Sequence, residues 1–186
     1  MRVIAGSAGG LALKPPGMGT RPTMDRVKGA IFSTLGERVP NSRVLDMFAG
    51  SGALGIEALS RGATCATFVE NHGPTAALIR RNLKWTNLEG IVQQMDAFRF
   101  LELHAKEGCF DLIFADPPYL KSYEGEGNNS AETLLAHPSL PTTLGSEGLF
   151  VLECAPRQPL PSLSSWVILS DRTYGESRVL ILRNSA

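Results

Sequence analysis

Four acidic residues follow apolar stretches along the chain: Asp46, Glu70, Asp96 and Asp116. Each stands at the end of a short hydrophobic run of the kind that forms a buried strand. The segments between them have the length and apolar spacing of helices. Because strands that alternate with helices form a mostly parallel sheet, with ligands bound at the carboxyl ends of the strands, the four carboxylates are predicted to line one edge of a sheet.

A glycine-rich loop follows the first of these acids. The stretch "GSGALG" (50–55) matches G-x-G-x-x-G, and Glu70 lies twenty residues after Gly50. Such a loop binds an adenosine cofactor, and on the simplest interpretation that cofactor is NAD. Asp46 favours another ligand, because a carboxylate beside the loop repels a pyrophosphate. S-adenosylmethionine (SAM) has no phosphate and carries a sulfonium and an ammonium, so the acid would attract it.

Each acid also has a purely structural explanation. Asp46 could cap the following turn, Glu70 could lie on the surface, and Asp96 could cap a helix at 97–106, which is the favoured interpretation for Asp96 alone. Taken together and in this order they predict a cofactor site. Asp46 would then lie by the amino-acid end, Glu70 would hold the ribose, and Asp96 would face the adenine amino group, with Phe98 packed on the ring or in the core.

The fourth strand ends in "FADPPYL" (114–120). Pro117 and Pro118 cannot donate backbone hydrogen bonds and make the exit from the strand stiff. The Asp116 carboxylate and the Pro117 carbonyl could accept both hydrogens of an exocyclic amine and aim its nitrogen at a methyl donor, while Tyr119 stacks on the base. The structural alternative is a rigid loop in which Asp116 caps the next turn.

Composition limits the class of protein. The 186 residues, 43% of them hydrophobic, suit one domain (1–186) with a short N-terminal extension and helix (1–43) before the core (44–186). The three cysteines and three histidines lack the spacing of a disulfide framework or a metal site, so no metal is predicted. No apolar stretch approaches the roughly 20 residues of a membrane span, which predicts a cytoplasmic, soluble protein.

Charge is uneven along the chain. Residues 1–43 hold seven basic and two acidic residues, whereas the remainder holds eleven basic and sixteen acidic ones. This asymmetry predicts a basic N-terminal face that docks nucleic acid, although ordinary solvated charge is an equal alternative. The segment 121–130 is polar and acidic, and is interpreted as a mobile lid or a neutral insertion.

Apolar periodicity and turn residues define the expected elements. A first helix is predicted from Thr23, as its N-cap, to residue 35. The other predicted helices cover 53–62, 74–86, 97–106 and 131–137. Strands are predicted at 43–49, 66–70, 91–96, 110–115, 148–154, 165–170 and 178–183, the last two joined as an antiparallel hairpin at the sheet edge.

Five stretches carry a family resemblance: "TRPTMDRVKGAIFSTL" (20–35), "VLDMFAGSGALGIEALSRGA" (44–63), "FVE" (68–70), "FDLIFADPPY" (110–119) and "YGES" (174–177). With them the chain resembles the bacterial 16S ribosomal RNA guanine-N2 methyltransferases over nearly its whole length. The resemblance implies a Rossmann-like, seven-stranded, mostly parallel α/β sheet, SAM as cofactor, and methylation of a guanine N2 amine. One departure is the apolar Leu11–Leu13, where family members often carry Arg or Lys, which weakens the case for phosphate binding at that turn.

The resemblance also implies roles for particular residues. Cofactor contacts are expected from Asp46, Phe48, Gly50, Ser51, Gly52, Glu70, Asn71, Asp96 and Ala97. Contacts with the target base are expected from Asp116, Pro117 and Tyr119, and contacts with the surrounding RNA from Arg21, Thr23, Asp25, Arg26 and Pro118.

Other functions stay open at this level. The "DPPY" stretch also suits an adenine-N6 methyltransferase acting on DNA or RNA, and the glycine loop suits an NAD-linked oxidoreductase. A non-catalytic RNA-binding protein with the same fold is a third alternative. The expected partner is 16S rRNA, either naked or in a small-subunit assembly intermediate, and the expected state is a monomer.

Overall fold

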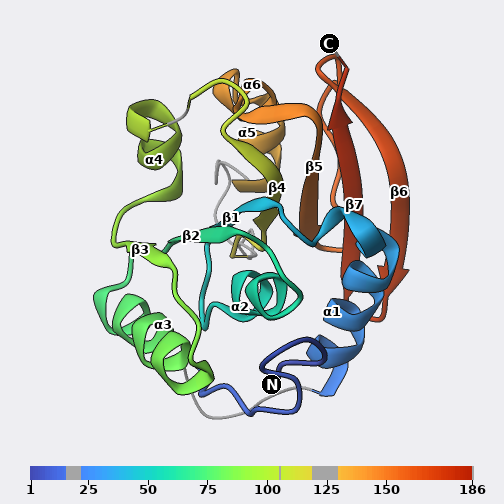
Figure 1. Cartoon of the computed structure of the whole chain (residues 1–186). Helices are drawn as coiled ribbons and strands as arrows, with labels where there is room; N and C mark the ends of the chain where they lie inside the picture. The colour runs from blue at the N-terminus through green and yellow to red at the C-terminus, as the bar shows by residue number, and fades with distance from the viewer. Residues whose placement is uncertain (16–21, 105, 119–129, 186) are drawn as a thin grey trace.

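The computed structural model describes residues 1–15, 22–104, 106–118 and 130–185. Seven strands form one sheet in the order β3-β2-β1-β4-β5-β7-β6 (Figure 1). Strands β1 to β5 are parallel, and β7 runs antiparallel to both β5 and β6. The predicted Rossmann-like sheet with a C-terminal antiparallel hairpin is thus confirmed. The strands are β1 (Arg43–Met47), β2 (Cys65–Val69), β3 (Ile91–Gln93), β4 (Phe110–Ala115), β5 (Leu144–Cys154), β6 (Trp166–Tyr174) and β7 (Ser177–Asn184).

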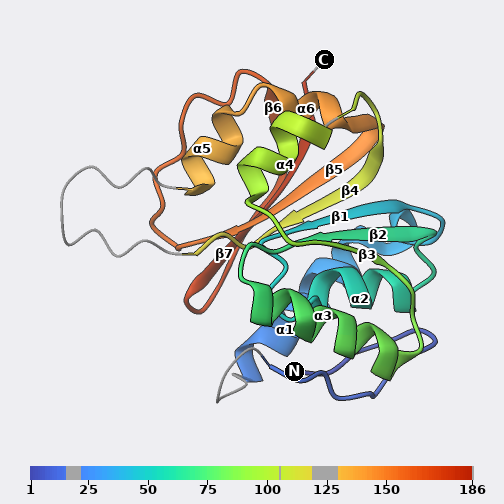
Figure 2. The ribbon, with the colours of Figure 1, turned by 90° about the vertical axis from the view of Figure 1, so that its left-hand side faces the viewer.

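Helices cover both faces of the sheet, as Figure 2 shows. One face carries α1 (Pro22–Leu35), α2 (Ala53–Ser60) and α3 (Gly73–Thr86), and the other carries α4 (Ala97–His104), α5 (Ser130–Ala136) and α6 (Ser139–Thr143). Because side chains alternate along a strand, neighbouring residues of β4 enter different cores. Phe114 packs in the cluster under α1–α3, and Ile113 packs in the cluster under α4–α6.

Several predicted boundaries were wrong. Helix α1 begins at Pro22, where a proline suits the first helical position, so Thr23 lies inside the helix and is not its N-cap. Helix α2 ends at Ser60, since Gly62 has a left-handed backbone (φ 96) that stops it early. Strand β3 ends at Gln93 and β5 begins at Leu144, before its predicted start. The short α6, and the 3₁₀ turn at Gly36–Arg38, had no prediction.

The N-terminal segment folds back on itself in a hairpin-like form. Arg2 and Ala12 form an antiparallel bridge, and the Val3 N–H donates to the Leu11 carbonyl at 2.9 Å. Val3 and Leu13 are buried in the core cluster beneath α1–α3. Leu11 and Leu13 therefore have a packing role, whereas Ala12 is exposed.

Candidate active site

A cavity of about 410 Å³ opens at the carboxyl ends of β1, β2 and β4 and after β3. Its volume lies in the range of small-molecule and cofactor pockets. Seven of the residues predicted from sequence line it: Phe48, Glu70, Asn71, Asp96, Ala97, Asp116 and Pro118. Val69, Met95 and Phe98 complete the lining, and of these only Phe98 was considered from sequence.

Asp46 holds the glycine loop from beneath. It is the second-last residue of β1 and is almost fully buried, and its Oδ2 accepts the Gly55 N–H at 2.8 Å, so the capping interpretation is confirmed. A Cβ at position 55 would lie 2.3 Å from the Phe68 ring and 3.1 Å from Asp46 Oδ2, which is why only glycine lets α2 come this close. Asp46 itself does not line the cavity. Burial raises the pKa of its carboxyl to about 7.

The backbone between β1 and α2 is left-handed at three positions. Phe48 has φ 56, Gly50 has φ 55 and Gly52 has φ 78. A bulky residue in this region is strained, and such strain is found mostly at functional sites. The Phe48 ring faces Phe98 edge-on across the cavity lining, with ring centroids 6.1 Å apart. The turn thus places an aromatic side chain on the cavity instead of in the core.

Ser51 stands in this turn without lining the cavity. It is buried, and its carbonyl accepts the Asn82 Nδ2–H at 2.9 Å. The Asn82 side chain also accepts the Lys14 N–H at 3.0 Å and donates to the Lys14 carbonyl at 3.1 Å. Asn82 therefore joins the glycine loop to the N-terminal segment. Gly50 and Gly52 also do not line the cavity, so their cofactor contacts stay predictions, and their left-handed backbone shapes the turn.

Glu70 connects β2 to the same loop. Its two oxygens accept the Gly50 N–H at 3.0 Å and the His72 N–H at 2.9 Å. The surface interpretation of this residue was wrong, because Glu70 is half-buried and lines the cavity. Each carboxylate oxygen has a second lone pair, so the group can still accept from ribose hydroxyls.

Asp96 caps a helix and also lies where its predicted contact with adenine could form. Its Oδ1 accepts the N–H groups of Phe98 and Arg99 at 2.9 and 3.0 Å, which caps α4 as the structural interpretation predicted. The residue also lines the cavity. Within the described residues its Oδ2 has no hydrogen-bond partner, so this oxygen can accept from the amino group of a bound adenine.

Asp116, Pro117 and Pro118 form a corner after β4, called the Asp116 corner, which lies beside the glycine loop. The β1–β4 register pairs Met47 with Ala115, so Asp116 follows β4 directly next to the end of β1. Asp116 and Pro118 line the cavity, whereas Pro117 is buried. Burial, with Glu153 and Asp46 as further causes, raises the pKa of Asp116 to about 8. Clustered carboxylates of this kind favour a ligand that brings positive charge or hydrogen-bond donors.

The predicted RNA-contact residues are only partly described. Arg21 and Tyr119 lie outside the described residues, as do the side chain of Thr23 and nearly all of the 121–130 segment. Arg26 is exposed on α1, and Asp25 accepts the Arg2 N–H through its Oδ1 at 3.3 Å. Their RNA contacts stay predictions.

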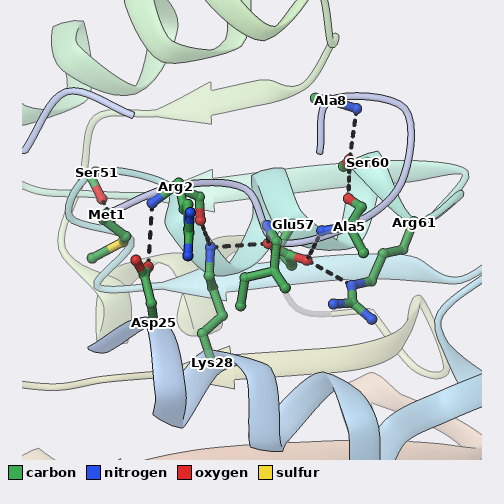
Figure 3. A network of polar contacts seen from close by, with 12 residues as sticks. Met1, Arg2, Ala5, Ala8, Asp25, Lys28, Ser51, Glu57, Ser60 and Arg61 are labelled. Atoms are coloured by element: carbon green, nitrogen blue, oxygen red, sulfur yellow. Dashed lines mark hydrogen bonds and ion pairs between the residues drawn. The ribbon is translucent and has the colours of Figure 1, made fainter. Parts of the chain in front are cut away.

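A buried ion-pair network was not found from sequence. Glu57 of α2 is fully buried, and Figure 3 shows Lys28 and Arg61 reaching its carboxylate from either side, at 3.0 and 2.7 Å. Its oxygens also accept the N–H groups of Ile4 and Ala5 at 2.7 and 3.1 Å. The network fastens the N-terminal segment and α1 to the helix that follows the glycine loop. The one local signal was an acid within the otherwise apolar stretch "ALGIEALS".

This network corrects the predicted basic face. Lys28 is buried against Glu57, and Arg43 is paired with Asp111 at 2.8 Å, so neither charge is free for phosphates. Among the described residues of the first 43, Arg2, Lys14, Arg26 and Arg38 are exposed.

Neither a metal site nor a membrane-spanning helix is present among the described residues. They contain no group of three or more His, Cys, Asp and Glu side chains arranged to hold a metal ion. The helices within 1–15, 22–104, 106–118 and 130–185 include none that is long and apolar enough to cross a membrane.

Residues 1–183 match the protein family described as "Conserved hypothetical protein 95". The chain belongs to this family. It is 34% identical to the ribosomal RNA small subunit methyltransferase D of Haemophilus influenzae over 179 residues, which span 94% of this chain and 89% of the relative. The predicted family membership is thereby confirmed.

Solved structures share the fold. A Thermus thermophilus hypothetical protein superimposes with a TM-score of 0.79 and 31% identity, covering 98% of this chain and 99% of the other. A 16S rRNA N2 G1207 methyltransferase of T. thermophilus, solved with AdoMet and guanosine, reaches a TM-score of 0.70 at 22% identity. The match covers 90% of this chain and 44% of that protein, and at this identity it supports the fold alone.

Proposed function

We propose that this protein transfers a methyl group from SAM to the N2 amine of one guanine in 16S ribosomal RNA. The observation that carries the proposal is the shared cavity. Glu70 and Asp96, suited to an adenosine, and Asp116 and Pro118, suited to an amine acceptor, line one continuous space. A bound methyl donor and the amine-binding corner would then be neighbours, as methyl transfer requires.

The residues present fit SAM. Asp46 is buried and Asp116 is half-buried, and neither takes part in an ion pair with another described residue. A sulfonium and an ammonium would supply the missing positive charge, whereas a pyrophosphate would add repulsion. The two carboxylates therefore disfavour an NAD-linked oxidoreductase.

SAM supplies an electrophilic methyl group when it is bound. The chain's part is to hold the amine: the Asp116 carboxylate and the Pro117 carbonyl accept its two hydrogens and direct the nitrogen toward the cavity. The methylated nitrogen must then lose a proton, and the burial that raises the pKa of Asp116 to about 8 also makes its carboxylate a stronger proton acceptor. Substrate RNA would dock through exposed N-terminal basic residues such as Arg26.

The proposal is tested by transfer of labelled methyl from SAM to a 16S transcript or a small-subunit assembly intermediate. Asp116→Asn should lose about 100-fold or more in rate while still binding SAM in a calorimeter. Asp111→Asn is the matched control, because Asp111 lies at the opposite end of the same strand, paired with Arg43. Equal activity of Asp116→Asn and wild-type protein would overturn the proposal.

A further inference from the structure

The carboxylate of Glu153 lies beside the Asp116 corner. The β4–β5 register pairs Ala115 with Leu152, so Asp116, which directly follows β4, lies next to Glu153 of β5. Phe114 and Val151 pack under α1–α3, and alternation points Asp116 and Glu153 to that same face. Neighbouring strands lie about 4.8 Å apart, which makes these two acids neighbours.

The surroundings of Glu153 favour a role in binding a ligand. It is half-buried, and its described partner is the side chain of Ser177 at the start of β7. None of the ion pairs among the described residues includes it. Burial raises the pKa of its carboxyl, against a smaller lowering by the Ser177 hydrogen bond. A half-buried acid without a cation is costly to the fold, so a binding role would account for it.

Its position also separates it from the cofactor. The adenosine-binding residues Glu70 and Asp96 follow β2 and β3, on one side of β1, whereas β4 and β5 lie on the other side. Glu153 does not line the cofactor cavity. The target base must approach the Asp116 corner from the side that the cofactor leaves open, which is the side of β5.

The hydrogen-bond donors and acceptors of guanine indicate a function for Glu153. Guanine presents an N1–H donor directly beside its N2 amine, whereas adenine presents an unprotonated N1 acceptor beside its amine. Asp116 and the Pro117 carbonyl account for the two amine hydrogens, and the N1–H then needs an acceptor of its own. An acceptor facing adenine N1 would leave two lone pairs opposed, and a site built for a hydrogen bond strongly rejects an analogue that lacks it.

The geometry points to Glu153 as the residue that accepts the N1–H of the target guanine and so selects guanine over adenine. This inference rests on the proposed function and deepens it, because amine methylation alone does not distinguish the two purines. Glu153 is thus a specificity-determining residue, and Ser177 orients its carboxylate.

The test uses the full-length protein and a 16S transcript in which the mapped target guanine is replaced by 2-aminopurine. This base keeps the N2 amine but has an unprotonated N1. Wild-type protein should prefer guanine by about 100-fold or more in kcat/KM. Glu153→Gln, whose amide can donate to N1, should reduce that preference at least tenfold. Glu147→Gln, an exposed position on the same strand, is the matched control and should leave the preference unchanged.

Each outcome is decisive. An unchanged guanine preference in Glu153→Gln, with SAM binding intact by calorimetry, overturns the assignment of Glu153. Equal wild-type methylation of guanine and 2-aminopurine also overturns it while leaving N2 methylation in place. Failure of the wild-type protein to methylate the N2 amine of any guanine in the unmodified transcript is instead a failure of the proposed function.

Discussion

Replacing Glu57 by glutamine should destabilise the protein severely. The side chain is fully buried and binds Lys28, Arg61 and two backbone N–H groups of the N-terminal segment. Glutamine keeps the shape but removes the charge, leaving the Lys28 ammonium buried with no carboxylate and turning an amide NH₂ toward other donors. Removing one partner of a buried ion pair costs about 3–5 kcal/mol, a large share of the 5–15 kcal/mol that typically stabilises a domain.

Urea unfolding measures this change directly. Asp111→Asn is the control, because its pair with Arg43 has both side chains about 40% exposed and should be worth about 1 kcal/mol or less. The double variant Lys28→Met with Glu57→Gln should cost less than the sum of the two single changes, because the buried Lys28 charge is then removed together with its carboxylate partner. The reasoning is refuted if Glu57→Gln loses less than about 1 kcal/mol or matches Asp111→Asn.

The contacts of Glu57 also make the stability of the protein depend on pH. Burial alone would raise the pKa of Glu57, but the Ile4 N–H, Lys28 and Arg61 together lower it below its usual 4.5. A lowered carboxyl pKa contributes stability above the unfolded value and loses it as the pH falls through the folded one. The stability gap between wild type and Glu57→Gln should therefore shrink below about pH 4.5, and a gap that widened in acid would contradict this sign.

Three further predictions concern other sites. Gly10→Ala should lower the free energy of unfolding, measured in urea, by about 1–2 kcal/mol, because only the left-handed backbone at this position opposes a side chain. Gly6→Ala should lower it by at least twice as much, because its Cβ would lie 1.7 Å from the Ser60 carbonyl oxygen. With the pKa of Asp46 raised to about 7 and that of Asp116 to about 8, calorimetric SAM affinity should increase between pH 6 and pH 8 as the two carboxylates ionise, and Asp46→Asn should reduce that increase, leaving the part that comes from Asp116. Phe98→Ala should weaken SAM binding by about 1–3 kcal/mol if its ring packs on the adenine, and an unchanged affinity would restrict it to core packing.

Much of the site could be predicted from sequence because it follows from local patterns. Strands with acids at their ends fix Glu70, Asp96 and Asp116 at one edge once the sheet is parallel, and the structure places all three on one cavity. The glycine pattern likewise located the loop between β1 and α2, in which Gly50 and Gly52 have a left-handed backbone.

The rest depends on contacts between distant segments. Lys28 and Glu57 are 29 positions apart and belong to different helices, so neither residue alone indicates the pair. Its charge placed Lys28 on the predicted basic face, but this prediction was wrong because the side chain is buried against Glu57. The early start of β5 at Leu144 depends on pairing with Phe110 across the sheet, which no local periodicity reveals.

The most direct measurement of the central claim is the identity of the methylated nucleoside. Wild-type protein, SAM and 16S RNA, as transcript or assembly intermediate, are incubated, and the RNA is digested and resolved by mass spectrometry. The account predicts N2-methylguanosine at a single position, lost with Asp116→Asn. N6-methyladenosine as the product, or no methylation in either form of the RNA, would contradict it.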